Sequence, residues 1–533
     1  MNKLQSKRFV QARTDRKAGR LQKSLESLLK LLKELPKSTE VRIELGVTYY
    51  GQGKLNEAAD IFYKLHEDFP EEINILNYCG VTYMQLGMFD LAIQFFKKYV
   101  GKKNDDYEAW INLCCAAGKN NQFTDAAFYA MQALSLKPLD SKAHQNMGSV
   151  MLALGRRQDA LISFQTALDL DPKNINALSN IGNIFGEINQ PENALAIYNE
   201  CLEKSPEDSP AQSDLKYRMS FEYMKLGQLD KAWDYYDHGF VMTDMQSRTP
   251  KRKFEVPQWK GQPIPGKKLM VWREQGLGDE LMFMPTLRDL LEDHNDVIIE
   301  CDPRLVTTLQ RSFPKCVVRT QAFYSPPNGL PVIKDYDFHI PLGSLLGIYR
   351  RTIQDFSKAS PYLVPDSNQV ANFQARINSR KPKIGICWRS GTLNAQRNQH
   401  YTPLSSWGPI FEMRNEVEFV NLQYGDCERE LFAAEDAFGM KIHRWEDVDL
   451  MNDLDALTSL IGSLDHVVSA GTAVAQFSMA VGIPLSLFLP NGHPWVLLGQ
   501  TQYPWYPNNS VKLYRPEVGQ IIDSVLPQIA ADL

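Results

Sequence analysis

The chain has 533 residues, of which 44% are hydrophobic and 23% are charged, and its formal net charge is −5. This is the composition of ordinary globular domains, and the length suffices for about three of them. The small negative net charge does not favour binding to nucleic acid, which requires a basic surface. The sequence has no run of about 18 apolar residues, so it predicts no membrane span.

The eight cysteines are scattered, and none has the two-residue spacing of a zinc or redox motif. The first residues are polar and basic and lack the apolar core of a secretory signal peptide. The sequence also lacks a His/Cys cluster and a Gly-x-x-x-x-Gly-Lys phosphate loop. We therefore expect a reduced, cytoplasmic protein with no metal and no resident cofactor.

Small residues and prolines recur with a period of 34 through the first half of the chain. The alanines are Ala58, Ala92, Ala126, Ala160 and Ala194, and the prolines are Pro36, Pro70, Pro138, Pro172 and Pro206. Two helices approach closely where side chains are small, and proline ends the second helix of each unit. This pattern resembles the tetratricopeptide repeat. It predicts seven units across residues 3–240, the last displaced by a loop insertion near residues 208–214.

Asparagine occupies the same position in three successive repeats, at Asn112, Asn146 and Asn180. Repeat arrays present a concave groove, and an amide there can pair with an extended peptide backbone whatever its sequence. The repeats of the eukaryotic O-linked N-acetylglucosamine transferase look similar and carry an asparagine ladder at this position. The resemblance implies that the repeats bind an acceptor protein. The alternative is that asparagine is simply common at this position of such repeats.

Residues 241–266 are rich in proline and glycine and predict an ordered linker, after which strands and helices alternate. The predicted strands are residues 269–272, 297–301, 316–318, 337–340, 383–388, 417–422, 466–470 and 484–489, and the predicted helices are residues 280–291, 454–464, 474–481 and 518–530. The pattern favours two doubly wound α/β domains, residues 267–365 and 366–533, that face each other across a cleft. We expect the C-terminal helix to pack toward the first of them.

One stretch joins the first predicted strand to its helix. An apolar run from Leu269 ends in a turn that contains Gly276 and Gly278, and Asp279 then opens an amphipathic segment. The glycines let the chain turn sharply and let a ligand come close to the backbone. Such a loop lies at the carboxyl end of its strand, where open α/β sheets bind ligands.

Five motifs follow one another in the second half of the chain. They are Glu-Gln-Gly-Leu-Gly-Asp at 274–279, Gly-Ile-Cys-Trp at 385–388, Asn-Leu-Gln at 421–423, Gly-Thr-Ala-Val-Ala at 471–475 and Trp-Tyr-Pro at 505–507. This order resembles a bacterial family that joins tetratricopeptide repeats to a GT-B glycosyltransferase module related to the lipopolysaccharide heptosyltransferases. The resemblance implies two Rossmann-like domains in GT-B arrangement, the first on the acceptor side and the second on the nucleotide-sugar side.

Inverting sugar transfer needs a base for the acceptor proton and positive charge for the departing nucleotide diphosphate. Asp279 matches the aspartate that the heptosyltransferases use as base, although aspartate is also a common helix cap. Arg389 ends a strand, where it could clamp phosphate or form a surface salt bridge. The turn Gly471-Thr472-Ala473 opens a helix whose free N–H groups suit an anion, or it is a purely structural turn.

The sequence departs from the family near the predicted sugar site. Relatives usually have Asp-Thr at Gly471-Thr472, a histidine at Gln476 and an arginine at His400. These differences imply a changed donor or a lost activity, and they make His400 and Gln476 weak candidates. The Asp-x-Asp at residues 447–449 is interpreted as a capping loop rather than a metal site. The aromatic residues Trp495, Tyr503, Trp505 and Tyr506 favour core packing over a sugar or base platform.

The expected function is that of a cytoplasmic, inverting, metal-independent glycosyltransferase. It would move a sugar from a nucleotide-sugar co-substrate to a protein hydroxyl, with the acceptor protein held by the repeats. Flagellin or another surface protein is the acceptor class that analogy suggests. A transferase for lipopolysaccharide or capsule precursors is one alternative. A scaffold with a decayed transferase module is the other.

Overall fold

The computed structural model describes residues 1–240, 254–321, 335–391, 401–491, 494–506, 511–517 and 519–533. The chain forms two compact units, Met1–Ile181 and Gly182–Leu533. The division falls inside a repeat helix, so the second unit contains the end of the repeat array as well as the α/β region. The domain boundaries drawn from the sequence stay predictions, and part of the predicted linker, residues 241–253, lies outside the described residues.

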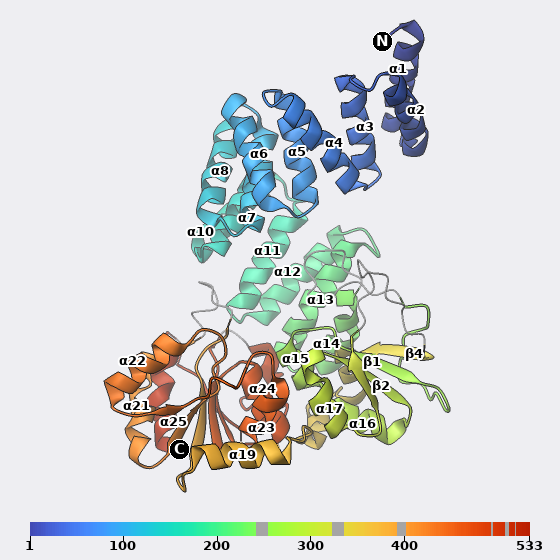
Figure 1. Cartoon of the computed structure of the whole chain (residues 1–533). Coiled ribbons are helices and arrows are strands. Elements are labelled where there is room, and N and C mark those ends of the chain that lie inside the picture. Colours follow the sequence, from blue (N-terminus) through green and yellow to red (C-terminus); the bar gives the residue numbers. More distant parts are fainter. Residues whose placement is uncertain (241–253, 322–334, 392–400, 492–493, 507–510, 518) are drawn as a thin grey trace. The chain divides into compact units, whose positions relative to one another are not determined.

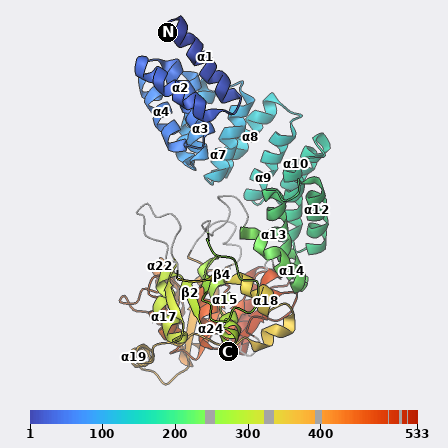
Figure 2. The same cartoon turned by 90° about the vertical axis from the view of Figure 1, so that its right-hand side faces the viewer.

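Residues 1–240, all of which the structure describes, form the seven helix pairs that the 34-residue period predicts (Figure 1). The helices are α1 Lys3–Lys17, α2 Leu21–Glu34, α3 Thr39–Gly51, α4 Leu55–Asp68, α5 Ile73–Gln85, α6 Phe89–Lys102, α7 Tyr107–Lys119, α8 Phe123–Leu136, α9 Ser141–Ala153, α10 Arg157–Leu170, α11 Ile175–Glu187, α12 Pro191–Lys204, α13 Pro210–Lys225 and α14 Leu229–Tyr236. Figure 2 shows the pairs of the first unit following one another.

A glycine in the first helix and an aromatic in the second let the two helices of a pair approach. A Cβ atom added at Gly80 would lie 2.7 Å from the Phe96 ring, and one at Gly148 would lie 2.7 Å from Phe164. The glycine therefore leaves the space that the ring fills, which is the packing that the sequence period predicts.

The displaced last repeat is a longer helix rather than a longer loop. Helix α13 has 16 residues, whereas α9 and the other first helices from α3 onward have 13. The side chain of Ser209 caps α13, and Pro210 occupies its first position, where proline is tolerated. The predicted loop insertion is therefore wrong, because most of the extra residues extend the helix.

The α/β region contains two parallel sheets, ordered β3-β2-β1-β4 and β10-β9-β8-β5-β6-β7. The strands are β1 Leu269–Trp272, β2 Val297–Cys301, β3 Val317–Thr320, β4 Phe338–Pro341, β5 Lys383–Cys387, β6 Glu418–Asn421, β7 Ile442–His443, β8 His466–Ala470, β9 Leu485–Phe488 and β10 Val511–Tyr514. We call the first sheet with its helices the first lobe and the second sheet with its helices the second lobe. The parallel α/β prediction is confirmed, although the two edge strands β7 and β10 were not predicted.

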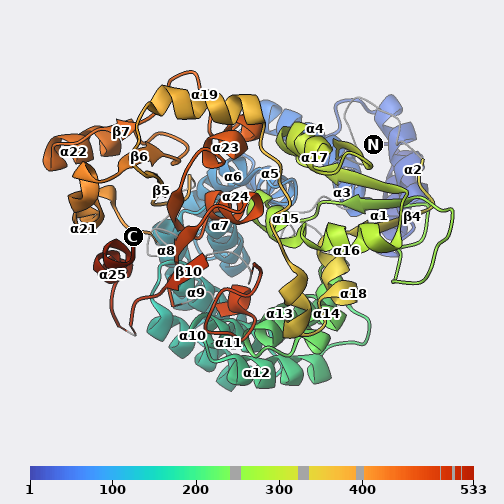
Figure 3. The ribbon, with the colours of Figure 1, turned by 90° about the horizontal axis from the view of Figure 1, so that it is seen from below.

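Helices cover both faces of the second sheet. The described helices of the two lobes are α15 Leu277–Phe283, α16 Thr286–Asp293, α17 Val306–Ser312, α18 Leu346–Tyr349, α19 Ser367–Ile377, α21 Gly408–Phe411, α22 Glu428–Phe438, α23 Leu454–Ile461, α24 Ala473–Val481 and α25 Leu526–Asp532. Helix α19 packs on α23 (Figure 3). Successive residues of β8 point to opposite faces of this sheet, so each face has its own hydrophobic core. Val467 belongs to the core formed with α23 and α24, and Val468 belongs to the core formed with α21 and α25.

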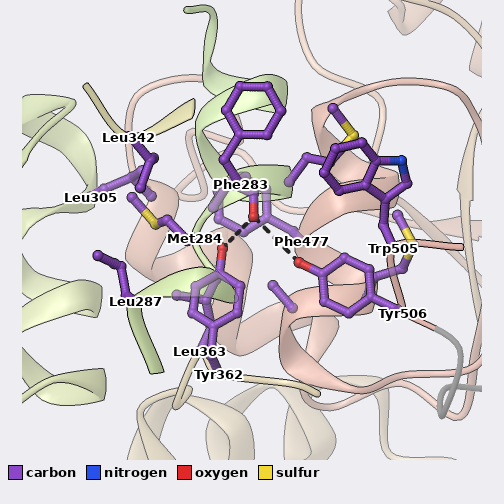
Figure 4. Close-up of a cluster of buried hydrophobic side chains, with 14 of the residues drawn as sticks. Phe283, Met284, Leu287, Leu305, Leu342, Tyr362, Leu363, Phe477, Trp505 and Tyr506 are labelled. Carbon is purple, nitrogen blue, oxygen red and sulfur yellow. Dashed lines mark hydrogen bonds between the residues drawn. The ribbon is translucent and has the colours of Figure 1, made fainter. Parts of the chain in front are cut away.

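The predicted helix at residues 280–291 is two helices, α15 and α16, because Pro285 interrupts it. Proline lacks the N–H that would bond the Leu281 carbonyl in a continuous helix. The hydroxyls of Tyr362 and Tyr506 donate to this carbonyl instead, at 2.8 and 3.3 Å (Figure 4). The break in the helix therefore fixes two distant segments of the chain against α15.

The C-terminal helix does not pack toward the first lobe, so that prediction is wrong. Helix α25 lies against α21, and its Leu526 and Ile529 complete the core on one face of the second sheet. The segment before β10 reaches the first lobe instead, where the Trp505 ring lies 5.8 Å from that of Phe283. In the described part of the chain, no helix combines the length and apolarity needed to cross a bilayer.

Candidate active cleft

A cleft of about 1110 Å³ opens in the second unit, between the loop after β1 and the turn after β8. Its walls come from both lobes and from the last repeat, which contributes Phe221 and Tyr236. Seven of the residues predicted from the sequence line it: Gly276, Gly278, Asp279, Gly471, Thr472, Ala473 and Gln476. Among the described lining residues, the charged ones are Asp279 and Arg304.

Asp279 is the third residue of α15, and Gly276 is the N-cap of that helix. The alternative interpretation of Asp279 as the cap is therefore wrong. Its side chain is half-buried in the cleft wall. A carboxylate in the first turn of a helix is stabilised by the partial positive charge of the N-terminus. The structure thus leaves the carboxylate of Asp279 at the cleft surface, and its role as base stays a prediction.

An ionic cluster of the first lobe holds one side of the Asp279 loop. Arg273 pairs with Asp302 at 2.8 Å and with Glu280 at 3.1 Å. The backbone N–H of Asp302 also donates to Glu280, at 3.0 Å. Burial raises the pKa of Glu280 to about 7, although the nearby guanidinium opposes the shift.

The last repeat holds the other side of the loop. The Gln275 amide donates to the hydroxyls of Tyr217, at 3.0 Å, and Tyr236, at 3.3 Å. Tyr236 donates to Glu274 at 3.4 Å, and burial raises the pKa of this carboxyl to about 8. Neither tyrosine is recognisable as a functional residue from the sequence. Tyr236 stands at a packing position of the repeat, so the period alone assigns it to the core.

The turn into α24 leaves little space at residue 471. A Cβ atom at Gly471 would lie 2.4 Å from the Leu489 side chain, so a larger residue does not fit here without a shift of that side chain. Thr472 is the N-cap of α24, and its hydroxyl lies 3.5 Å from the Cys387 sulfur at the end of β5. The helix N-terminus therefore faces the cleft with a small residue before its cap.

Gln476 joins α24 to the aromatic segment. Its amide donates to the hydroxyl of Tyr503 at 2.9 Å, and that hydroxyl in turn lies 3.5 Å from the Met282 sulfur. All three residues line the cleft. The amide of Gln476 is thus linked to α15 of the first lobe through the hydroxyl of Tyr503.

Arg389 is not brought to the cleft wall. Its guanidinium is buried and pairs with Glu430, with an Nε to Oε1 distance of 3.0 Å, and donates to the Asp426 carbonyl at 2.8 Å. This geometry corresponds to the salt-bridge alternative, and the phosphate role stays a prediction. His400 lies outside the described residues. Arg304, which the sequence analysis missed, lines the cleft and is held by Asp302 at 2.8 Å.

The aromatic segment divides into core and cleft residues. Tyr503, Trp505 and Tyr506 are buried in the core, as predicted, and Tyr503 also lines the cleft, as does the half-buried Trp495. The Trp495 ring lies 5.5 Å from that of Phe221 in the last repeat. In the Asp-x-Asp loop, Asp449 accepts hydrogen bonds from the backbone of Met451 and Asn452 in a turn, and the helix that follows, α23, is capped by Asp453.

The three predicted peptide-binding asparagines lie in the first unit, on the first helices of their pairs. First helices of neighbouring pairs pack on each other at α1 and α3, at α5 and α7, and at α7 and α9, which places these helices on the inner side of the array. Asn112, Asn146 and Asn180 are half-buried there, on α7, α9 and α11. The Asn146 amide lies 3.8 Å from the Cys115 sulfur of the preceding repeat. Burial between the helices, which would contradict the ladder, is not observed for these three.

Comparison with known families identifies the repeats. Models of the tetratricopeptide repeat match residues 9–73, 141–174 and 175–208, and a model of the coatomer epsilon subunit matches residues 47–127. A solved structure of MamA MSR-1 is 24% identical, covers 32% of this chain and 97% of its own, and has a TM-score of 0.30. YrrB, described as a tetratricopeptide-repeat protein with an unusual peptide-binding site, is 20% identical, covers 32% of this chain and 88% of its own, and has a TM-score of 0.30.

One curated relative spans both parts of the chain. Protein FlbA of Caulobacter vibrioides is 30% identical over 462 residues, which cover 83% of this chain and 75% of the relative. A match of that length must include much of the α/β region as well as the repeats. The likeness therefore concerns the joined architecture and not the repeats alone.

Proposed function

The chain belongs to the family of Protein FlbA, and from its cleft we propose that it is a glycosyltransferase that moves a sugar from a nucleotide-sugar donor to a protein hydroxyl. One observation carries the proposal. Asp279 and the N-terminus of α24, which come from different lobes, line the same cleft. A base and an anion site on opposing walls are what an inverting transfer requires.

In the proposed reaction, Asp279 takes the proton of the acceptor hydroxyl. The acceptor oxygen attacks the anomeric carbon from the face opposite the nucleotide, and the bond from that carbon to the diphosphate oxygen breaks. The N-terminus of α24 and the Arg304 guanidinium then stabilise the charge of the released nucleotide diphosphate. The configuration at the anomeric carbon inverts, because a single displacement takes place.

The proposed arrangement of the lobes is GT-B. The first lobe, which carries Asp279, would bind the acceptor, and the second, which carries α24, would bind the nucleotide sugar. GT-B lobes can close on substrate, so reacting groups draw together only in the complex. The neutral Gln476 and the small Gly471 imply that the donor sugar is recognised differently from a heptose.

We propose that the repeats hold the acceptor protein. The aligned amides of Asn112, Asn146 and Asn180 can pair with an extended backbone of any sequence. Flagellin or another surface protein modified before export is the acceptor class to test first, by analogy. A cytoplasmic location is supported by the eight cysteines, all of them free.

A non-catalytic scaffold is the second candidate. Arg389 favours this candidate, because its guanidinium pairs with Glu430 instead of facing the cleft, where it was predicted to bind phosphate. Gly471 and Gln476 favour it too, because the resembling transferases carry an aspartate and a histidine at these positions. A transferase directed at lipopolysaccharide or capsule precursors remains the enzymatic alternative.

The purified chain should be screened against UDP-, GDP-, CMP- and ADP-linked sugars for thermal stabilisation, since a ligand that binds the folded state raises Tm. The stabilising donor should then be incubated with candidate acceptor proteins. A mass increase of one sugar on the protein supports the proposal. Hydrolysis without a protein acceptor points to the glycan-directed enzyme, and the absence of both binding and turnover points to the scaffold.

The asparagine ladder gives a prediction of its own. Replacing Asn112, Asn146 and Asn180 by alanine should weaken acceptor-protein binding by at least ~10-fold, because each net hydrogen bond contributes about 0.5–1.5 kcal/mol. The affinity for the nucleotide sugar should stay within about twofold, because the cleft belongs to the other unit. Titration calorimetry measures both affinities.

A matched control keeps the number of amides removed constant. Gln94, Gln132 and Gln165 lie on the second helices α6, α8 and α10 of the same unit. Their triple alanine variant should bind the acceptor normally. Equal losses in the two triple variants would show that the inner side of the array is not the acceptor site.

A further inference from the structure

We infer that the last repeat, α13–α14, belongs to the reaction centre, where Tyr217 and Tyr236 are positioning residues that fix the loop carrying Asp279. The inference rests on the proposed function for its catalytic consequence and on hydrogen bonds for its structural part. It assigns to the repeat array a second task besides protein binding.

The two tyrosines converge on one amide. Tyr217 comes from α13 and Tyr236 from α14, and their ring centroids lie 5.7 Å apart. The Gln275 side chain donates to both hydroxyls, at 3.0 and 3.3 Å. Gln275 directly precedes Gly276, the cap of α15, so the bonded amide stands four residues before Asp279.

The neighbouring carboxyl adds a second bond between the repeat and the loop. Glu274 accepts from Tyr236 at 3.4 Å and from the backbone N–H of Gly343 at 2.6 Å. A Cβ atom at Gly343 would lie 2.1 Å from the Glu274 carboxylate and 2.9 Å from the Tyr236 hydroxyl. The site has room for these polar groups only because residue 343 has no side chain.

The repeat itself is anchored on both sides of the cleft. On the first lobe, the Trp233 indole donates to the Arg350 carbonyl at 2.8 Å, and Ser344 donates to Asp237 at 2.5 Å. On the other side, the turn between α13 and α14 lies close to the backbone that follows the cleft residue Trp495. A Cβ atom added at Gly227 in this turn would lie only 3.3 Å from the Leu498 carbonyl. A repeat fixed at both ends can hold the loop at a constant position.

Small displacements matter at a reacting carboxylate, because a shift of about 1 Å can cost roughly 10²-fold in rate. Helix α15 has seven residues, so its orientation depends on the loop that leads into it. The ionic cluster of Arg273 fixes that loop on one side, and the tyrosines fix it on the other. Removing the two hydroxyls deletes the hydrogen bonds between the repeat and residues 274–275, while both rings and the Gly343 bond to Glu274 remain.

The test is the double variant Tyr217→Phe/Tyr236→Phe, with Tyr223→Phe/Tyr235→Phe as the matched control. The control removes two hydroxyls from the same two helices, where the Tyr223 and Tyr235 rings pack on each other outside the cleft. We expect kcat of the first variant to fall by about 10–100-fold, with KM for the nucleotide sugar within about twofold. The control should match the wild-type chain in both constants.

Hydrogen exchange of the backbone amides of residues 275–283 supplies a readout that needs no activity. Exchange should quicken in the first double variant and stay unchanged in the control. Unchanged exchange, or faster exchange with wild-type kcat in an active enzyme, would overturn the inference. A wild-type chain without transferase activity refutes the proposed function, whereas exchange still decides whether the tyrosines hold the loop. If the double variant does not fold, the same measurements are made on Tyr217→Phe alone, which removes the shorter of the two hydrogen bonds from Gln275.

Discussion

Asp279→Asn is expected to lower sugar transfer by roughly 10²–10⁴-fold, the usual contribution of a positioned base. The amide keeps the shape of the carboxylate at the third position of α15 but cannot take a proton. Affinity for the nucleotide sugar should change little, because the groups proposed to bind the diphosphate are the N-terminus of α24 and Arg304, not Asp279. Single-turnover transfer measures the chemical step, and thermal stabilisation by the donor measures binding.

Glu292→Gln is the control, because it neutralises an exposed carboxylate on the neighbouring helix α16. It should leave both measurements unchanged. Full transfer by Asp279→Asn would reduce Asp279 to a residue of the cleft wall. A loss of donor binding instead of turnover would move Asp279 to the nucleotide side of the reaction.

The meeting of Asp279 with the turn at residues 471–473 could be predicted from the sequence. Each follows a buried strand of a parallel sheet, and the carboxyl ends of such strands lie at one edge. The motif order then implied that the two edges share a cleft. This prediction depends only on the order of the strands and on the position of the loops, and it requires no knowledge of side-chain contacts.

Side-chain pairing could not be predicted in the same way. Arg389 ends a strand as expected, but its partner Glu430 lies 41 positions later on α22, and the sequence does not specify which charges pair. Tyr236 shows the same limit. The repeat period places it in the core, and only the fold shows that its hydroxyl reaches the loop after β1.

Element boundaries were missed for local reasons. Pro285 was present in the predicted helix at residues 280–291, and its missing N–H was the signal that the helix breaks there. The extra residues of the last repeat gave no such signal. A shift in the period shows that residues were added, but it does not show whether they lengthen a loop or, as in α13, a helix.

Asp289→Ala is expected to cost about 3–5 kcal/mol of unfolding free energy in the second unit, because it leaves a buried charge unpaired. Arg350 is 1% exposed. Its guanidinium pairs with Asp289 at 2.6 Å and donates to the Tyr349 carbonyl at 2.8 Å, and its own carbonyl accepts from Trp233. Denaturant unfolding followed by tryptophan fluorescence reports on this region.

The adjacent Arg351 provides the comparison that tests the role of burial. Its pair with Asp234 spans 3.0 Å, but the two side chains are 43% and 61% exposed. Asp234→Ala should therefore cost at most about 1 kcal/mol, since exposed pairs contribute little. Replacing both partners, as Asp289→Leu/Arg350→Met, should recover most of the stability that Asp289→Ala loses. If Asp289→Ala costs no more than Asp234→Ala, the buried guanidinium is solvated or paired in another way.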